Sequence, residues 1–382
     1  MSFLELSEEQ EMLIRTISRL AKEKLAPMDE EMEKKGVFPN EVWELFKENG
    51  ILGIPFPEEY DGSGMGILSY CMAVEELAKF NNNAASMLVG QFLGSTPIIF
   101  AGNEEQKRKY LPHIVSGEYI VAFGMTEPGA GSDVGSMTST AVRDGDHYVL
   151  NGRKCFISNG DIAKIICVFA KTDQKAGHNG VSGFILDTAT PGFSVGKTED
   201  KMSGKPIHAC ELIFEDVRIP KENLLGKEGE GFKIAMQVLD RARPGIAARA
   251  VGLAQGSLDY AVDYIKQRVQ FGQPIAKNQG IQWMVADMAT EIEAARLLYY
   301  RACQEIENNG HEIGKYGAMA KYYSTDMAMK VTTDAVQLLG GYGFMEDYPL
   351  ARRMRDAKLA QIIEGTNQIQ RIVVGRSVIG KI

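Results

Sequence analysis

Cysteine and histidine are scarce in this chain and follow no motif. The 382 residues contain five of each, and neither a C-x-x-C nor an H-x-x-x-H spacing occurs. Isolated cysteines and histidines do not form the ligand sets that zinc prefers, so no metal site is predicted. We expect the cysteines to be reduced and mostly buried, as in a cytosolic protein.

Phosphate-binding glycine motifs are missing as well. The sequence has no G-x-x-x-x-G-K-[S/T], and no G-x-G-x-x-G follows a predicted strand. Both motifs place backbone N–H groups around phosphates at the start of a helix. Direct use of a nicotinamide dinucleotide through such a unit is therefore not indicated.

Excess positive charge and long apolar runs are also absent. The formal net charge is −8, which argues against a nucleic-acid partner held by general basic charge. Met1–Glu5 carries no positively charged start, and the strongest apolar run, Ala163–Ala170, is far too short to span a membrane. We expect a cytoplasmic protein with no signal peptide and no membrane insertion.

The sequence that is present divides into regions of different character. Its length allows two or three domains. Residues 1–120 favour helices, whereas residues 121–225 are β-prone, and their Asp144-Gly145 and Asn151-Gly152 pairs predict hairpin turns. From residue 226, apolar residues recur every three or four positions, which predicts a helical bundle, and Pro244 predicts a helix start or a kink. The predicted fold class is α+β.

One acid stands out near the end of the chain, in the stretch Ile362–Arg371. Glu364 follows two isoleucines and precedes Gly365 and Thr366. Apolar neighbours raise the pKa of a carboxyl group and make it a better base near neutral pH, and a glycine lets a ligand approach the backbone. On the pattern alone, the simpler interpretation is favoured: an acid in the first turn of a capped helix, without a function.

The same stretch resembles a family signature. Asp356-Ala357-Lys358 followed by Ile363–Gln370 is similar to the closing signature of the acyl-CoA dehydrogenases, and other motifs of that family occur in the right order over almost the whole chain. The resemblance implies that Glu364 is the base that removes the α-proton of an acyl-CoA. It also implies an acyl-CoA dehydrogenase-like fold with an N-terminal helical domain (1–120), a middle antiparallel β domain (121–225) and a C-terminal four-helix bundle (226–382).

Two motifs imply contacts with the flavin of FAD. Taken alone, Phe123–Asp133 is a strand that runs into a Gly-Pro turn, and Phe156–Ser158 is the end of a core strand. In the family both lie against the flavin, and the second usually reads Trp-Ile-Thr, so an aromatic ring and a hydroxyl remain here. The FAD contacts implied by these motifs and by the helix start after Glu364 are Phe123, Met125, Thr126, Ser132, Phe156, Ile157, Ser158, Thr366, Asn367 and Gln368.

A second set of FAD contacts is implied at the ends of two later helices. Taken alone, Arg268–Ile275 and Gln337–Gly343 are ordinary helix ends. In the family they serve an FAD held mainly by a neighbouring subunit, and the planar donor fork of arginine suits its diphosphate. The resemblance therefore implies a homotetramer, a dimer of dimers. The residues so implied are Arg268, Gln270, Phe271, Asn278, Gln279, Gln337, Leu338, Gly340 and Gly341.

The contacts with acyl-CoA are implied mainly by Leu239–Pro244, which taken alone is a charged helix end before a proline. Some relatives place the base on this helix, where this chain has Ala242, so the base is expected at Glu364. One segment departs from the family: Met202–Ile207 stands in place of Met-Gly-x-Arg-x-Ser, and Ile207 replaces a serine that touches CoA. The substrate contacts so implied are Ser132, Asp240, Arg241, Ala242, Arg243, Gly365 and Arg376.

Together these implications describe an FAD-dependent acyl-CoA dehydrogenase that acts on a short- to medium-chain acyl-CoA. Glu364 would take the α-proton, the β-hydrogen would leave as hydride to the flavin, and an electron-transferring flavoprotein would accept the electrons. Two alternatives stay open: an enoyl-CoA reductase that runs the same chemistry in reverse and, less favoured, a non-catalytic acyl-CoA-binding or scaffold protein. Retention of Glu364 together with the flavin motifs argues against the non-catalytic alternative.

Overall fold

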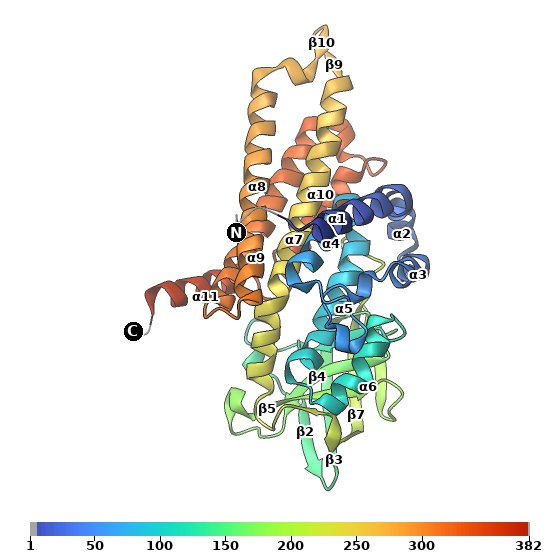
Figure 1. The fold of residues 1–382 in the computed structure, drawn as a ribbon, viewed down its shortest axis with the longest axis vertical. Coiled ribbons are helices and arrows are strands. Elements are labelled where there is room, and N and C mark those ends of the chain that lie inside the picture. Colours follow the sequence, from blue (N-terminus) through green and yellow to red (C-terminus); the bar gives the residue numbers. More distant parts are fainter. Residues whose placement is uncertain (1–5, 381–382) are drawn as a thin grey trace.

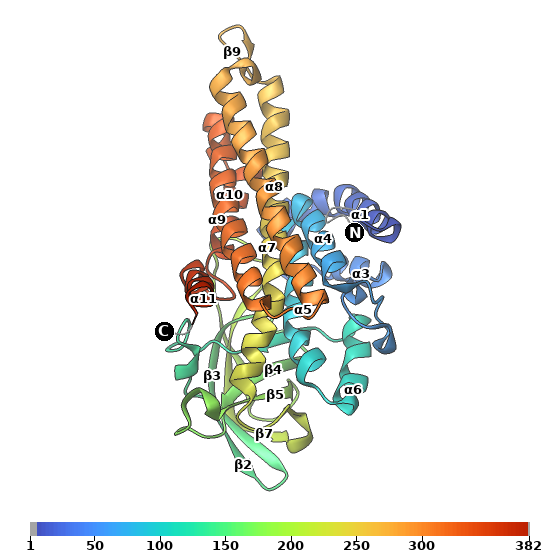
Figure 2. The same ribbon diagram turned by 60° about the vertical axis from the view of Figure 1, so that its left-hand side comes forward.

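The fold is elongated and consists of a column of helices with a β domain at one end (Figures 1 and 2). We describe a computed structural model of the chain over residues 6–380. The predicted absence of a signal peptide concerned Met1–Glu5, which lies outside the described residues. The hairpin β9–β10 (Val269–Gln270 and Gln273–Pro274) marks the free end of the column.

The N-terminal helices pack against one side of this column. Ser7 caps the first helix, because its hydroxyl accepts from Gln10 N and the Gln10 side chain accepts from Ser7 N. The chain then passes through short π and 3₁₀ turns across Pro27 without leaving the helical region. The helices of this region are α1 (Glu8–Leu20), α2 (Asp29–Lys35), α3 (Asn40–Glu48), α4 (Gly66–Phe80), α5 (Asn82–Ala101) and α6 (Glu104–Val115).

Helix α5 is apolar over a longer stretch than the short run Ala163–Ala170. It is the one described helix long and apolar enough to cross a membrane by length and composition alone. However, 67% of its most apolar 18-residue window is buried inside the protein. Figure 1 shows α5 between the bundle and the β domain, where a helix must be apolar nearly all round because it is covered nearly all round.

The β domain is one eight-stranded sheet in the order β6-β7-β3-β2-β4-β5-β8, with β1 also paired to β4. Most neighbouring strands are antiparallel, as predicted. However, β1 runs parallel to β4, and β2 is joined to β4 by a single parallel residue pair. The strands are β1 (Val121–Gly124), β2 (Thr140–Asp144), β3 (His147–Ser158), β4 (Ile165–Lys171), β5 (Val181–Asp187), β6 (Phe193–Thr198), β7 (Ala209–Pro220) and β8 (Leu224–Leu225).

The predicted hairpin at Asn151-Gly152 is wrong. Asp144-Gly145 does turn the chain between β2 and β3, but β3 continues through Asn151 and Gly152 with a bulge against β7. The Asn151 side chain exchanges hydrogen bonds with Asp216 of β7, which fixes the bulge. Gly152 has φ of 141°, and an added Cβ would lie 2.3 Å from Ser139 Oγ. The glycine therefore serves a close strand approach rather than a turn.

The C-terminal helices form the bundle. Pro244 lies inside α7 and does not start a helix, since the helix runs on through a fully buried stretch from 242 to 254. Tertiary packing there outweighs the hydrogen bond that proline removes. The helices are α7 (Gly231–Gln267), α8 (Gln279–Glu307), α9 (Ile313–Leu339), α10 (Pro349–Ala360) and α11 (Asn367–Ile379), and α11 projects from the side of the column.

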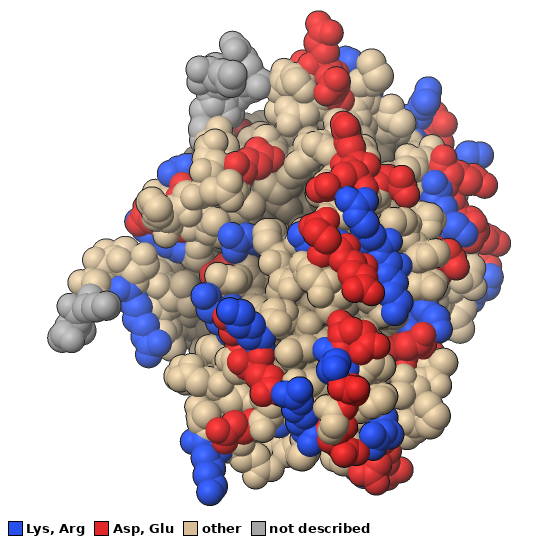
Figure 3. All heavy atoms as spheres, turned by 60° about the horizontal axis from the view of Figure 1, so that its bottom comes forward, with Lys and Arg blue, Asp and Glu red and all other residues tan. Residues whose placement is uncertain are grey.

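The largest apolar core joins the N-terminal helices to the bundle, and a separate core fills the sheet. On the face shown in Figure 3, lysines and arginines are interspersed with aspartates and glutamates and do not gather into one basic surface. The fold class predicted from the sequence is confirmed, with its helical, β and helical regions in that order.

Candidate active site

Glu364 lies on the loop that joins α10 to α11. Both Glu364 (φ 52°) and Gly365 (φ 86°) adopt the left-handed backbone conformation. A non-glycine residue in this conformation costs about 1–3 kcal/mol and persists only where its surroundings fix it. Thr366 ends the loop as the cap of α11, its hydroxyl accepting from Ile369 N at 3.4 Å. The capped helix start predicted from the sequence is present, and the acid precedes it in a strained turn.

The carboxyl group of Glu364 has one buried oxygen, although the residue as a whole is only half-buried. Its Oε2 is inaccessible to solvent and has no hydrogen-bond partner among the described residues. Burial raises the pKa of Glu364 to about 7, although the positive charges of Lys321, Arg249 and Arg243 lower it. A carboxyl group with a pKa near neutrality and a free oxygen is suited to accept a proton from a ligand.

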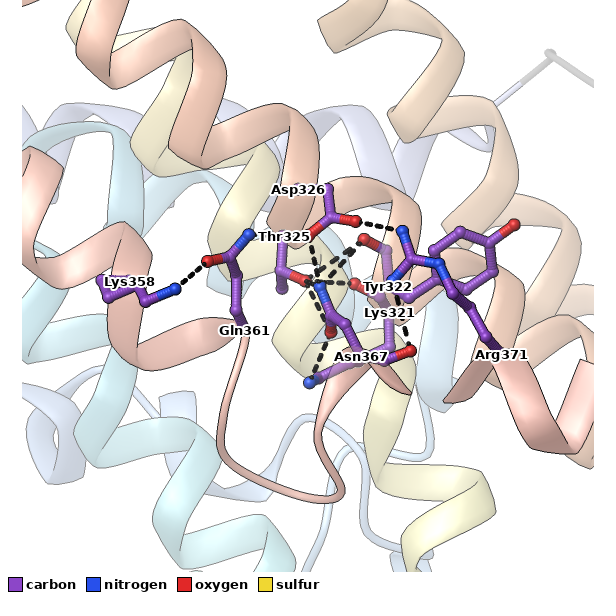
Figure 4. Close-up of polar contacts among 8 residues, drawn as sticks. All are labelled: Lys321, Tyr322, Thr325, Asp326, Lys358, Gln361, Asn367 and Arg371. Atoms are coloured by element: carbon purple, nitrogen blue, oxygen red, sulfur yellow. Dashed lines mark hydrogen bonds and ion pairs between the residues drawn. The ribbon is translucent and has the colours of Figure 1, made fainter. Parts of the chain in front are cut away.

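A polar network on α9 holds the loop around this acid (Figure 4). Asn367 is 2% exposed, and its amide donates to Asp326 Oδ1 at 2.7 Å while its Oδ1 accepts from Lys321 Nζ at 2.9 Å. Asp326 also accepts from Gln361 at 2.7 Å and from Arg371 at 2.6 Å. Both ends of the loop are thus fastened to one helix, and the Asn367 side chain is used within the chain itself.

Helix α7 supplies the predicted substrate residues around Ala242. Arg243 is 4% exposed and forms a short ion pair with Asp240, one turn earlier. Arg243 Nε has no hydrogen-bond partner among the described residues. Arg241 lies over the Phe100 ring, 4.7 Å from its centroid. Arg243 therefore faces the interior with a free donor, whereas Arg241 points along the surface of α5.

The first flavin motif is shaped by a buried ion pair that the sequence interpretation did not single out. Lys154 Nζ contacts Glu127 Oε1 at 2.7 Å, and the two side chains are 0% and 3% exposed. Glu127 also accepts from Thr138 N at 2.6 Å and from Ser139 N at 3.0 Å. Burial alone would raise the pKa of Glu127, but Lys154 and these donors lower it to about 2. The pair closes the loop that follows β1.

Around this pair the predicted flavin residues from two strands come together. Thr126 O accepts from Cys155 N at 2.9 Å, which places the residue after β1 beside the end of β3. Met125 and Ile157 are buried, whereas Phe156 is 65% exposed with φ of 58°. An exposed aromatic ring on a left-handed backbone is suited to stack on a planar ligand. Ser132 and Ser158 are exposed in the same region.

The second set of predicted FAD residues lies at the free end of the bundle. Arg268, Gln270 and Gln337–Tyr342 line a cavity of about 680 Å³ between the ends of α7 and α9. The Arg268 guanidinium lies 5.7 Å from the centroid of the Tyr342 ring. Phe271, at the tip of the β9–β10 hairpin, is fully exposed. Asn278 and Gln279 begin α8 next to this hairpin and are exposed as well.

These two sets of residues lie far apart within one chain. Ala242 and Arg268 are separated by about 39 Å along α7 at the helical rise of 1.5 Å per residue. Figures 1 and 2 show the β domain and the β9–β10 hairpin at opposite ends of the molecule. The structure therefore brings the first set together at the junction of β1 and β3, and it holds the second set at the other end of the bundle. Arg376 is also apart, exposed near the end of α11.

The segment Met202–Ile207 connects the β domain to the N-terminal helices. Lys205 N donates to Glu33 Oε2 at 3.2 Å, and Lys201 Nζ donates to Gly204 O at 2.5 Å. Ile207 is 8% exposed and packs in the largest core. The apolar residue that stands in place of the family's serine is used for packing between domains.

Some residues of the site gave no recognisable signal in the sequence. Lys321, Arg249 and Asp326 lie in long helices, where single charges are common. Only the fold brings Lys321 and Arg249 toward Glu364 and Asp326 to Asn367. Within residues 6–380, no group of three or more His, Cys, Asp or Glu side chains could hold a metal ion. The fold and this site define a class: a helical–β–helical protein that holds a carboxyl group of raised pKa on a strained loop and presents an exposed aromatic ring at the end of β3.

Family comparisons agree with that class over the whole chain. The profile of the acyl-CoA dehydrogenase N-terminal domain matches residues 7–118, that of the middle domain residues 122–217, and that of the C-terminal domain residues 229–379. An acyl-CoA dehydrogenase of Bacillus subtilis is 46% identical over 99% of this chain and 100% of its own length. An acryloyl-CoA reductase (NADH) of Anaerotignum propionicum is 46% identical over 98% and 95%.

Two solved structures are similar over their full length. The butyryl-CoA dehydrogenase of Megasphaera elsdenii has a TM-score of 0.96 and 45% identity over 99% of this chain and 100% of that one. A chain from the structure of the electron transferring flavoprotein of Acidaminococcus fermentans has a TM-score of 0.97 and 50% identity over 99% and 100%. The present chain belongs to the acyl-CoA dehydrogenase family and is an oxidoreductase of that family.

Proposed function

We propose that this protein is an FAD-dependent acyl-CoA dehydrogenase in which Glu364 removes the α-proton of a short- to medium-chain acyl-CoA to give the trans-2-enoyl-CoA. The observation that carries the proposal is the buried, unpartnered Oε2 of Glu364, on a carboxyl group whose pKa burial raises to about 7. A base of that pKa is half ionised near neutral pH, and a pKa close to the working pH favours general-base catalysis.

The residues around Glu364 support the other parts of the reaction. The backbone N–H of Glu364 has no hydrogen-bond acceptor among the described residues, so it can donate to a thioester oxygen as negative charge develops there. Arg243, Arg249 and the protonated form of Lys321 add buried positive charge that lowers the pKa of Glu364. Such fixed charges, shielded from water, stabilise an enolate-like transition state without reorganisation.

The residues of the β domain fit the flavin of FAD. The exposed Phe156 ring, the Thr126 hydroxyl and the buried Met125 offer an aromatic face, a polar group and an apolar floor in one place. These residues would hold the ring system, and Thr366 with Gln368 would contact it from the α11 side. When bound, FAD supplies the acceptor for the hydride that leaves the β-carbon.

The free end of the bundle supports an assembly of several copies, and we propose a homotetramer built as a dimer of dimers. Phe344 is 77% exposed and Trp283 63% exposed, and with Phe271 they give this end an apolar surface. Surfaces of this kind commonly mark interfaces. Arg268 and the Gln337–Gly341 segment would then reach the diphosphate of an FAD held by another copy. Light scattering of the FAD-loaded protein tests the proposed mass.

Electron-transferring flavoprotein is the proposed acceptor of the electrons, and the cytoplasm is the proposed location. The similarity to the A. fermentans chain supports the acceptor. The Anaerotignum relative favours a second candidate function, reduction of an enoyl-CoA. A panel of acyl-CoAs and enoyl-CoAs assayed with electron-transferring flavoprotein in both redox states separates the two. Reduction of the oxidised flavoprotein by butyryl-CoA supports the dehydrogenase. If only the enoyl-CoAs are turned over, with the reduced flavoprotein as electron donor, the result supports the reductase.

A further inference from the structure

Lys321 is a buried lysine beside the loop that carries Glu364. Its side chain is 0% exposed, in the middle of α9. No carboxylate oxygen of the described residues lies within 4.0 Å of its Nζ, although lysine is almost never buried without a charged partner. A methionine of similar length would fill the same space at lower cost, so the amine calls for an explanation beyond packing.

The hydrogen bonds of Lys321 all go to the base loop. Nζ donates to Gly365 O at 2.9 Å and to Asn367 Oδ1 at 2.9 Å, one on each side of Thr366. Gln370 holds the same turn from α11, since its Nε2 donates to Glu364 O at 3.1 Å and to Gly365 O at 2.9 Å. These donors fix the carbonyl groups of the left-handed turn, a conformation that requires such support.

The charge of Lys321 acts on the same acid. Burial lowers the pKa of Lys321 to about 7, whereas Glu364 raises it. The charged groups that face Lys321 are Glu364 from the loop, Arg243 and Arg249 from α7, and Asp326 from α9. Reciprocally, Lys321 is the largest of the three positive influences that lower the pKa of Glu364. The ammonium form of Lys321 therefore favours the carboxylate form of Glu364.

We propose that Lys321 is the positioning residue of the base: it fixes the left-handed turn at Glu364–Gly365 through the Gly365 carbonyl and Asn367, and its charge keeps Glu364 ready to accept a proton. This inference rests on the proposed role of Glu364. It assigns two separable duties to one side chain, a geometric duty carried by hydrogen bonds and an electrostatic duty carried by charge.

Two substitutions separate these duties. Lys321→Met removes the hydrogen bonds and the charge, whereas Lys321→Gln keeps a donor but removes the charge. The matched control is Lys330→Met, on the same helix, where the exposed Lys330 pairs with Glu291 at the surface. FAD absorbance and near-ultraviolet circular dichroism first verify that each variant is folded and loaded.

Three measurements then test the inference. Infrared difference titration follows the Glu364 carboxyl band, hydrogen exchange follows the backbone of residues 361–367, and anaerobic stopped flow follows flavin reduction by butyryl-CoA. We expect the Glu364 titration to move to higher pH in both variants, because a nearby cation is lost. Exchange of the loop should quicken clearly in Lys321→Met and less in Lys321→Gln. Reduction of the flavin at saturating butyryl-CoA should slow about 10- to 100-fold in both variants, as expected for a displaced catalytic group. KM should be nearly unchanged.

The outcomes distinguish this inference from the function on which it rests. Folded Lys321→Gln with the wild-type titration of Glu364 and the wild-type rate would overturn the positioning role, even if Glu364→Gln is inactive. A fully active Glu364→Gln would instead remove the proposed base. The infrared titration and the exchange rates do not depend on turnover, so they report on Lys321 in either case. If Lys321→Met fails to fold, Lys321→Gln still decides the electrostatic duty.

Discussion

The two ends of the molecule differ in how far their predicted site residues are buried and supported by the same chain. At the Glu364 end, one carboxyl oxygen of the acid is buried, its loop is hydrogen-bonded to α9, and its neighbouring charges belong to the same chain. At the free end of the bundle, Arg268 and Phe271 are exposed around an open cavity. The comparison teaches that one chain positions the proposed base with its own residues, whereas the second set lies exposed, as expected if it serves the FAD of another copy in the proposed assembly.

The largest effect should come from breaking the buried pair that shapes the flavin loop. Lys154→Met leaves Glu127 as an uncompensated buried charge. Removing one partner of a buried pair typically costs about 3–5 kcal/mol of folding free energy. We expect a strongly lowered urea midpoint and loss of FAD. The matched control is Arg153→Met, because Arg153 is the adjacent residue and its side chain is 62% exposed. Equal midpoints for the two variants would show that the pair does not support the loop.

A smaller effect should come from the bundle end. Arg268→Ala should cost about 1.5–3 kcal/mol of FAD binding, the range for a hydrogen bond to a charged group. FAD should be lost on dilution and the assembly should weaken with it, while the pH dependence of proton removal stays as in the wild type. Lys266→Ala, two residues earlier and also exposed, is the control. Equilibrium dialysis decides: retention of FAD equal to the control would contradict a diphosphate contact.

The smallest effect is a pH dependence at the Glu364 end. Glu364 accepts a proton only when ionised, and burial raises its pKa to about 7. The rate of flavin reduction should therefore fall about twofold from pH 8 to pH 7 and about tenfold per unit well below it. Since Lys321 also has a pKa of about 7, the two groups titrate as a pair. Stopped flow across pH 5.5–8.5, roughly the range in which a base of this kind titrates, gives the dependence of the rate on pH. A rate that stays constant down to about pH 5.5 would show that no group with a pKa near 7 controls proton removal.

The same comparison shows what the sequence can and cannot predict. The helical and β regions follow from periodicity and turn chemistry. Glu364 was singled out by a local motif, and only the resemblance of that motif to a family signature implied its role. Lys321 was not found, because it lies 43 residues before the acid on a helix whose pattern gives it no distinction. Only the packing of α9 against the loop brings Lys321 to Gly365 O.

The wrong hairpin at Asn151-Gly152 and the helix start that Pro244 does not make have the same physical origin. Asn151-Gly152 has turn chemistry, but pairing with β7 and the close approach of Ser139 turn it into a bulge. Pro244 would interrupt an isolated helix, but burial on all sides keeps α7 continuous. In both cases tertiary contacts override a local preference worth only a few kcal/mol.

The most direct test of the central claim is the reduction of the flavin in Glu364→Gln. The substitution keeps the size of the side chain but removes its capacity to take the α-proton. FAD should still bind, because Phe156, Thr126 and Arg268 are unchanged, and acyl-CoA should still bind beside Arg243. General-base catalysis contributes about 10²–10⁴-fold, so anaerobic bleaching of the flavin by butyryl-CoA should slow by at least that range. Bleaching at a near wild-type rate would show that the base lies elsewhere and would contradict the account.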